Sequence, residues 1–407
     1  MSKSSRQSAM STAPTGGTSE HFDYVVVGLG ALGSATAWEL ARRGNSVLGL
    51  ERFELGHNRG ASHDTSRILR HSYHTPAYVR LTLEAYDDWA RLEAESGQQL
   101  VAKVGGLDFF PPQAAIPSID YTRAMDEVGI GYESLAPSDV ADRWPMFALD
   151  DGVSTIYQPD SAIVPAGRGT ATMQALARKH GAVLRDHAAV TGLQADEGSV
   201  TVTVGSAHDG DTYTAAGVVV TADAWVNDVI GHLGAHIPLE VTLEQVTYFA
   251  PEQPETFAPD RMPLWIWMDD PSYYGFPCYG EATVKAAQDC GGPIVDPDNR
   301  TFDPDPEMRG RLADFMRTLL PGSGAPVRSL RCQYTLTRDR DFVVSPAPGH
   351  DNVVVGMGAA HGFKFAPTFG RMLADLVSTG ETTSDIAAFT MDRPGITDPN
   401  YQPHWLV

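Results

Sequence analysis

DYVVVGLGALG, at residues 23–33, places a short apolar run directly before a glycine-rich loop. The run predicts a buried β-strand, and the residues from Ala35 to Arg43 favour a helix that stops at Gly44. A second apolar run, from Ser46 to Leu50, predicts another strand and is followed at once by Glu51. The order strand, helix, strand forms a βαβ unit, which is more informative than a glycine pattern alone.

This unit has the features of a dinucleotide-binding site. Its glycines let the backbone approach a pyrophosphate, and the helix offers free N–H groups and the positive end of its dipole. A carboxylate that ends the second strand is placed to bind ribose hydroxyls. The unit does not separate FAD from NAD. The contacts it predicts are Gly28, Gly30, Ala31, Leu32, Gly33 and Glu51.

Composition narrows the class of protein. The chain has 407 residues, 42% of them hydrophobic, which is enough for one large core or two linked cores. A net charge of -21 disfavours nucleic-acid and anionic-membrane partners, and no apolar run approaches the roughly 20 residues of a membrane helix. Cys278, Cys290 and Cys332 are too few for a disulfide framework or a metal site, so we expect a cytoplasmic, metal-free protein.

Four stretches together resemble the monomeric sarcosine oxidase and N-methyltryptophan oxidase family of flavoproteins. They are the glycine loop, Ser62 to His71, Tyr274 to Lys285, and Cys332 to Phe365, and the resemblance runs from about residue 22 to about residue 395. It implies an α/β fold in which a glutathione-reductase-like FAD-binding domain is interleaved with an antiparallel β-sheet substrate domain. We expect an FAD domain at 22–100, 158–235 and 326–395, a substrate domain at 101–157 and 236–325, a disordered tail at 1–21 and a C-terminal tail at 396–407.

Two cations are candidates to bind a substrate carboxylate. Arg67 and Arg70 are three residues apart, which on a helical turn puts them on one face. The resemblance implies that Arg70 grips the carboxylate, which a guanidinium fork suits, and that Arg67 lies by the flavin. Lys364 matches the second carboxylate ligand, and a lysine between two phenylalanines is otherwise unusual because a buried unpaired ammonium is unfavourable. The alternatives are a solvated basic turn and a surface lysine.

A third cation is a candidate to act on oxygen. The resemblance implies that Lys285 lies by the flavin, on the face opposite the amine, where a fixed cation stabilises the anion formed as O2 is reduced. Tyr274 is expected to line the pocket. The alternatives are a surface lysine and an ordinary core tyrosine.

The resemblance also assigns the flavin contacts. Cys332 matches the cysteine that forms a thioether to a ring methyl group, although burial as a free thiol is the commoner fate of a cysteine. His361 and Gly362 are expected against the isoalloxazine, with a structural histidine as the alternative for His361. The other predicted cofactor-binding residues are Arg52, Ser62, His63, Ser66, Val190, Met357 and Lys364.

The predicted reaction is the FAD-dependent oxidation of a secondary amine of an amino acid. The imine product hydrolyses, and O2 becomes H2O2. The expected partners are this small amine and O2, with the chain a monomer or small homo-oligomer. A cyclic imino acid oxidase, a dehydrogenase and a non-catalytic flavoprotein are the alternatives.

The sequence departs from the family pattern around the pocket. Asp289 replaces a frequent histidine, Ser66 a threonine and Ala360 a glycine. We expect Asp289 either to add negative charge near the substrate or to pair with Lys285.

Overall fold

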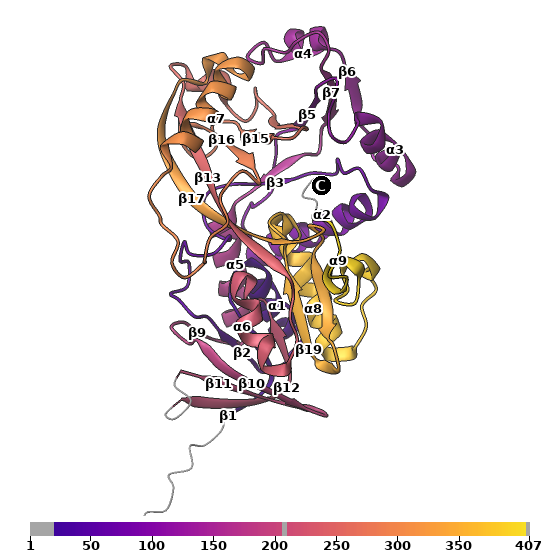
Figure 1. Cartoon of the computed structure of the whole chain (residues 1–407), viewed down its shortest axis with the longest axis vertical. Coiled ribbons are helices and arrows are strands. Elements are labelled where there is room, and N and C mark those ends of the chain that lie inside the picture. The colour runs from indigo at the N-terminus through magenta and orange to yellow at the C-terminus, as the bar shows by residue number, and fades with distance from the viewer. Residues whose placement is uncertain (1–19, 206–209, 404–407) are drawn as a thin grey trace, which may run out of the picture.

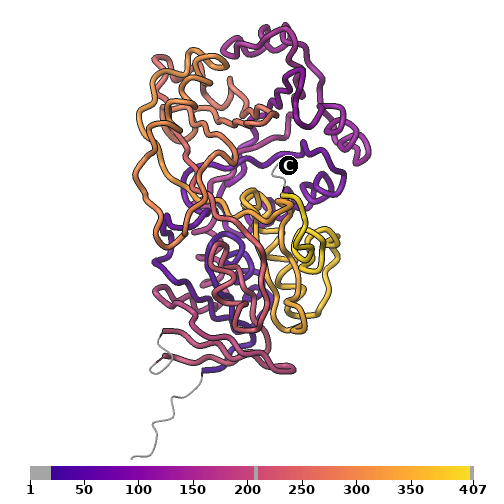
Figure 2. Tube along the Cα trace, in the orientation of Figure 1, coloured from indigo at the N-terminus to yellow at the C-terminus, as the bar shows by residue number. Residues whose placement is uncertain are grey.

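The computed structural model describes residues 20–205 and 210–403. The tail predicted at 1–21 lies almost wholly outside the described residues, as does the end of the tail predicted at 396–407. The described chain forms two large sheets: Figure 1 shows β13, β15 and β16 in the upper part and β1, β2 and β12 in the lower part. The chain passes between the two parts several times, so that indigo, magenta and yellow segments meet in the lower part (Figure 2). This is the interleaved architecture predicted from the sequence, and the α/β fold class is confirmed.

The lower sheet is built around parallel strands. β1 pairs with β2 and β12, β2 pairs with β9, and β12 pairs with β19, all in parallel. Antiparallel strands β10, β11 and β18 complete it. Its strands are β1 (Glu20–Val27), β2 (Val47–Leu50), β9 (Val183–Arg185), β10 (Val190–Asp196), β11 (Ser199–Val204), β12 (Asp211–Val220), β18 (Val343–Ala347) and β19 (His350–Met357).

The upper sheet is antiparallel except for one parallel pair, β5 with β14. Its strands, in spatial order, are β17 (Ala325–Thr337), β13 (Leu239–Ala250), β16 (Val284–Asp289), β15 (Ser272–Phe276), β14 (Leu264–Trp267), β5 (Gly106–Phe110), β7 (Ser154–Gln158) and β6 (Glu133–Leu135). β17 lies at the start of the predicted segment 326–395 and pairs along its length with β13 in this sheet. The domain boundaries remain a prediction.

A small third sheet and the helices surround these strands. The small sheet contains β3 (Arg67–Leu69), β4 (Ala102–Lys103) and β8 (Ala162–Val164). The helices are α1 (Ala31–Arg42), α2 (Pro76–Ser96), α3 (Ser118–Val128), α4 (Pro137–Arg143), α5 (Ala166–Lys179), α6 (Val226–Ile230), α7 (Pro306–Leu319), α8 (Ala366–Thr379) and α9 (Pro394–Thr397).

Local chemistry explains where two helices begin, of which the first was predicted. α1 starts directly after Gly30, earlier than Ala35, because the last glycine of the loop is already helical. α7 starts at Pro306, where the side chain of Asp305 accepts hydrogen bonds from the N–H groups of Glu307 and Met308 at 2.8 and 3.1 Å. Among the described residues, no helix combines the length and the apolar character that crossing a bilayer requires.

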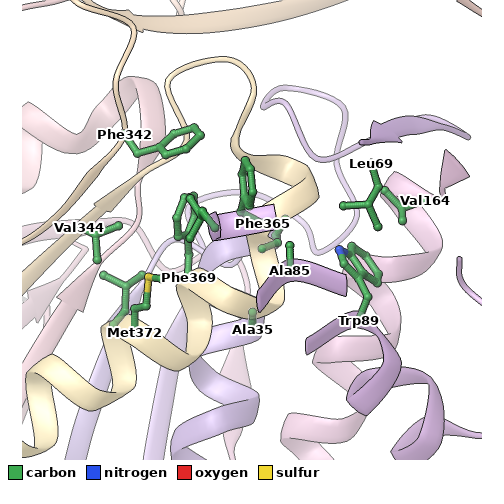
Figure 3. Close-up of a cluster of buried hydrophobic side chains, with 14 of the residues drawn as sticks. Ala35, Leu69, Ala85, Trp89, Val164, Phe342, Val344, Phe365, Phe369 and Met372 are labelled. Carbon is green, nitrogen blue, oxygen red and sulfur yellow. The ribbon is translucent and has the colours of Figure 1, made fainter. Parts of the chain in front are cut away.

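The largest buried cluster of apolar side chains joins α1, α2 and α8 to the lower sheet. Figure 3 shows Phe342, Phe365 and Phe369 beside one another, with Trp89 of α2 near Leu69. The ring centroids of Phe342 and Phe365 are 5.3 Å apart, and the indole of Trp89 donates a hydrogen bond to the carbonyl of Lys364 at 2.7 Å. This core therefore fixes the segment that carries His361 and Lys364.

Candidate active site

A cavity of about 490 Å³ opens at the carboxyl ends of β1, β2, β12 and β19. This is the edge of a parallel sheet where α/β proteins bind nucleotides. Most of the predicted cofactor-binding residues line the cavity, namely Gly28, Gly30, Ala31, Leu32, Glu51, Arg52, Ser62, His63, Arg67, Val190, Cys332, Met357 and Gly362. The other predicted contacts, Gly33, Ser66, His361 and Lys364, lie outside its lining.

The glycine loop is closely packed against strand β12. Gly28 has φ +89, and a Cβ there would come within 2.6 Å of the carbonyl oxygen of Thr221. A Cβ at Gly33 would lie only 1.8 Å from the carbonyl oxygen of Gly28. Side chains at either position would push α1 away from the strand. The glycines therefore keep the amino end of α1 against the cavity.

Glu51 directly follows β2, and its carboxylate faces the glycine loop. It accepts hydrogen bonds from the N–H groups of Leu29 and Phe53 at 2.8 and 3.0 Å, and His57 lies 3.4 Å away. Burial raises the pKa of Glu51, but His57 and these backbone N–H groups outweigh it, so the net pKa is below its ordinary value. Glu51 is therefore ionised, as an acceptor of ribose hydroxyls must be.

Several buried polar atoms of residues that line the cavity have no hydrogen-bond partner within the described residues, among them Nε2 of His63 and Oδ2 of Asp223. Burial lowers the pKa of His63 to about 4 and raises that of Asp223 to about 6. Unsatisfied groups of this kind fit a cofactor rich in hydroxyl and phosphate oxygens. The sequence analysis missed Asp223, although it follows the strand β12 that lies next to β1. The glycine cradle, the carboxylate and these two atoms together fit FAD.

Arg67 begins strand β3 and Arg70 directly follows that strand, so the two do not lie on the predicted helical turn. β3 spans Arg67–Leu69 and pairs with β8. The guanidinium of Arg67 donates to the carbonyl oxygens of Ala61, His63 and Ser66 at 2.9 to 3.0 Å. The prediction of a helical turn was therefore wrong, but Arg67 and Arg70 still have different surroundings.

Arg70 and Lys364 meet at the ring of Tyr73. The Cζ of Arg70 lies 4.7 Å from the ring centroid and the Nζ of Lys364 5.6 Å from it. The carboxylate of Asp108 lies 3.6 Å from Arg70, and Lys364 donates a hydrogen bond to the carbonyl of His361 at 2.9 Å. Burial, then the charges of Arg70 and Arg340, hold the pKa of Lys364 well below its ordinary value. Two buried cations thus share one small region.

Arg340 adds a third cation, which the sequence analysis missed. It has φ +58, and its guanidinium pairs with Asp289 at 2.8 Å. Its carbonyl oxygen lies 3.0 Å from Nε2 of His361, whose ring stacks against Tyr78 and packs on Phe342. Of the two surroundings expected for Asp289, pairing with Lys285 is wrong, because its partner is Arg340. The backbone conformation that brings Arg340 here left no clear sequence signal.

The ammonium of Lys285 does not join Arg70 and Lys364, and instead contacts the loop before β3. Its Nζ forms an ion pair with Asp64 at 2.6 Å and donates hydrogen bonds to the carbonyl and hydroxyl oxygens of Ser66 at 3.0 and 3.2 Å. The Lys285 side chain is 4% exposed. Lys285 is therefore not a surface lysine, and Asp64 is a third residue that sequence reasoning missed.

Cys332 lies on β17 and is buried, with its residue 5% exposed, while lining the cavity. Burial raises the pKa of its thiol, and the cations of Arg67 and Lys285 act in the opposite direction. The hydroxyl groups of Tyr274 and Tyr334 are 3.3 Å apart beside this strand. Cys278 and Cys290 are half-buried and do not line the cavity. Among the three cysteines, Cys332 is thus the one placed to meet a bound cofactor.

Comparison with known proteins agrees with this geometry. The sequence profile of the FAD dependent oxidoreductase family matches residues 23–376. Monomeric sarcosine oxidase from Bacillus sp. (strain B-0618) is 30% identical over 386 residues, which is 93% of this chain and 98% of the relative. N-methyl-L-tryptophan oxidase from Yersinia pestis (strain Pestoides F) is 27% identical over 377 residues, which is 91% and 99%.

The solved structures extend the likeness to three dimensions. NikD, an unusual amino acid oxidase essential for nikkomycin biosynthesis, is 30% identical with a TM-score of 0.81, covering 91% of this chain and 98% of that one. L-proline dehydrogenase from P. horikoshii has a TM-score of 0.80 at 19% identity, which shows the shared fold alone. On the family profile and the near full-length match to the curated relatives, the chain belongs to the FAD dependent oxidoreductase family, among the monomeric sarcosine oxidases and their relatives.

Proposed function

We propose that this protein oxidises a secondary amine of an amino acid and passes the electrons to O2. The observation that carries the proposal is the pair Arg70 and Lys364, both buried against the ring of Tyr73. Its relatives include enzymes named for sarcosine and for N-methyl-L-tryptophan, which are both N-methyl amino acids. A carboxylate is what such substrates share, and two adjacent cations are what a carboxylate requires.

The charges around Tyr73 support a role in carboxylate binding. Within the described residues, the hydrogen bond that Lys364 makes is to a neutral carbonyl, and the carboxylate nearest to Arg70 is 3.6 Å away. Asp108 therefore balances Arg70 in part, whereas the buried ammonium of Lys364 has no salt-bridge partner within the described residues, which is unfavourable. A substrate carboxylate between the two cations supplies the missing charge, and it fixes the position of the amine carbon.

FAD, when bound, would supply the redox chemistry, namely acceptance of a hydride equivalent from the carbon next to nitrogen and transfer of two electrons to O2. Oxidation converts the C–N single bond into an imine, which water hydrolyses, and O2 gains two electrons and two protons to become H2O2. The residues that would hold the cofactor are the glycine loop, Glu51, His63, Arg67 and Asp223. Lys285 places a cation where negative charge develops on O2.

We also propose that Cys332 attaches the flavin through a thioether to a ring methyl group. Cys332 is the cysteine that lines the cavity, and it lies near the cations of Arg67 and Lys285, which favour its thiolate. The bond replaces one S–H and one C–H bond by a C–S bond. Two hydrogen atoms are therefore removed, and O2 accepts them as H2O2.

A cyclic imino acid, of pipecolate or proline type, is the second candidate substrate. NikD, an unusual amino acid oxidase of a biosynthetic route, is as similar in sequence as the sarcosine oxidases are, so relatives at this distance are not named for N-methyl amino acids alone. The same two cations suit a cyclic amino acid, because they contact its carboxylate and not its ring.

Peroxide release tests the proposal. Purified protein is mixed with N-methyl amino acids, with cyclic imino acids, and with the matched amides in which the carboxylate is neutral. We expect peroxide from at least one acid and a loss of about tenfold or more for its amide, because one lost charged hydrogen bond costs about 1.5–3 kcal/mol. Equal oxidation of an acid and its amide would refute the carboxylate site.

A further inference from the structure

The surroundings of Lys285 differ from those of a lysine exposed to an open site. Its Nζ contacts Asp64 at 2.6 Å and Ser66 at 3.0 and 3.2 Å, and all three oxygens come from the loop that precedes β3. The side chains of both Lys285 and Asp64 are 4% exposed. The ammonium is thus held on one side by a direct, buried ion pair.

Asp64 is itself fixed on several sides. It has φ +80, a conformation that aspartate tolerates better than most residues do, and its carbonyl accepts a hydrogen bond from the N–H of Gly167 at 3.0 Å. Its Oδ1 accepts a hydrogen bond from the hydroxyl of Tyr248. Tyr248 lies opposite Lys285 in the pairing of β13 with β16. The carboxylate is therefore aimed at Lys285 by contacts that do not involve the lysine.

Opposing effects act on the charge of Lys285. Burial and the charge of Arg67 lower the pKa of Lys285, whereas Asp64 and Cys332 raise it; burial has the largest effect, and the net pKa is about 8. The charged and titratable groups that face Lys285 are Asp64, Arg67 and His63 from the loop and β3, Cys332 from β17, and Tyr248 from β13. Asp64 carries the negative charge in this set at neutral pH, because the charges of Lys285 and Arg67 hold its pKa below the ordinary value despite burial.

We propose that Asp64 is a positioning residue for oxygen reduction, which fixes Nζ of Lys285 and keeps it an ammonium ion in a site that otherwise favours the neutral amine. The proposal rests on the proposed role of Lys285 with oxygen. The carboxylate also screens part of the lysine's field. The two effects change the reoxidation rate in opposite directions. Keeping Lys285 protonated speeds reoxidation, because it decides whether the positive charge exists. Screening slows reoxidation, because it weakens the field of that charge.

Because the first effect depends on pH, the reoxidation rates of the wild type and of an Asp64 variant should cross when they are plotted against pH. Asp64→Asn removes the charge with little change of shape, and asparagine tolerates a positive φ. Above the pKa of Lys285, reoxidation in the variant should be about tenfold slower for each unit by which that pKa has fallen, because the ammonium population changes by that factor. At a pH low enough to keep the lysine charged, the variant should be as fast as the wild type or faster. Lys285→Arg, with Asp64 intact, should lose this pH dependence because arginine stays protonated.

The experiment measures one half-reaction alone. The flavin of the holoenzyme is reduced chemically, without amine, and mixed with oxygenated buffer in a stopped-flow instrument at several pH values. Asp160→Asn is the matched control, because it removes a carboxylate that also lies 2.6 Å from a lysine, Lys103, but in an exposed pair. Its profile should match that of the wild type.

A double variant separates a role through Lys285 from a general structural role. Adding Asp64→Asn to Lys285→Met should change reoxidation no further, since the group on which Asp64 acts is gone. An additional loss there, or an Asp64→Asn profile identical to that of the wild type, would overturn the proposal. If Asp64→Asn does not fold, Lys285→Arg provides the test. A reoxidation rate in Lys285→Arg that still falls at the pH where the wild-type rate falls overturns the proposal. If Lys285→Met reoxidises at the wild-type rate, the proposed role of Lys285 with oxygen is refuted instead. If no amine reduces the flavin, only the proposed substrate class is refuted.

Discussion

Asp289 is paired with Arg340 at 2.8 Å, although it lies on the same strand as Lys285 and only four residues after it. Successive side chains of a strand alternate between faces, so these two residues project from one face of β16. They nevertheless have separate partners, Arg340 for Asp289 and Asp64 for Lys285. One strand thus carries a charged pair at each end, one beside Arg70 and Lys364 and the other at the proposed oxygen site.

Asp289→Asn should destabilise the protein without changing reoxidation of the flavin. Arg340 would lose its carboxylate partner in a buried site, and hydrogen bonds to charged groups contribute about 1.5–3 kcal/mol to the free energy of unfolding. Urea unfolding measures the change. The exposed pair of Lys103 with Asp160 offers a control, because Asp160→Asn should cost only about 0–1 kcal/mol. Equal midpoints for wild type and Asp289→Asn would contradict a stabilising pair.

Cys332→Ser should leave the flavin extractable. In the wild type, yellow colour should remain with the polypeptide after acid precipitation, because the proposed thioether survives unfolding. In the variant the colour should pass into the supernatant, whereas Cys278→Ser should behave as the wild type does. Wild-type flavin that washes out completely would show that the cofactor is not covalently bound.

Gly33→Ala should abolish flavin binding or severely weaken it. A Cβ at this position would lie 1.8 Å from the carbonyl oxygen of Gly28, so the loop must move away from α1. The measurement is the ratio of flavin to protein absorbance after purification. Gly310→Ala, in α7, adds the same methyl group where no atom lies within 4 Å, and should keep full flavin content. Normal flavin content in Gly33→Ala would mean that the loop does not form the predicted cradle.

Binding of a carboxylate inhibitor should weaken as the pH rises. The pKa of Lys364 is well below its ordinary value through burial and the charges of Arg70 and Arg340, so the ammonium needed for binding is lost on the alkaline side at a lower pH than for an exposed lysine. The dissociation constant is followed by perturbation of the flavin spectrum. Lys364→Met should bind about tenfold or more weakly at neutral pH and should lose this alkaline dependence. A wild-type affinity that does not change up to the ordinary pKa of lysine would exclude Lys364 from the site.

Local sequence patterns predicted the fold better than the site. The run at residues 23–33 and the carboxylate at Glu51 identified the βαβ unit because strand, loop and helix are adjacent in the chain. The same reasoning placed Arg67 and Arg70 on a helix, because a spacing of three residues does not distinguish a turn from an extended strand. Pairing with β8 in the folded protein makes residues 67–69 a strand.

The partners of the charged residues were the part that could not be predicted. Asp64 reaches Lys285, and Arg340 reaches Asp289, across distances in sequence that no local pattern spans. Both Asp64 and Arg340 have positive φ values, which their side chains do not signal. The resemblance to a known family named the cations because their roles are carried by short motifs. It could not name Asp64, because that residue acts through a loop conformation specific to the folded chain.

The central claim is that the two cation sites serve different half-reactions, with Arg70 and Lys364 acting on the amino acid and Lys285 on oxygen. Stopped-flow measurement of both half-reactions in Lys364→Met and Lys285→Met tests it directly. We predict that Lys364→Met slows flavin reduction by the amine and leaves reoxidation intact. Lys285→Met should do the reverse, with reoxidation slower by ~10²–10³, as when one preorganised electrostatic donor is removed. Loss of the same half-reaction in both variants would contradict the claim.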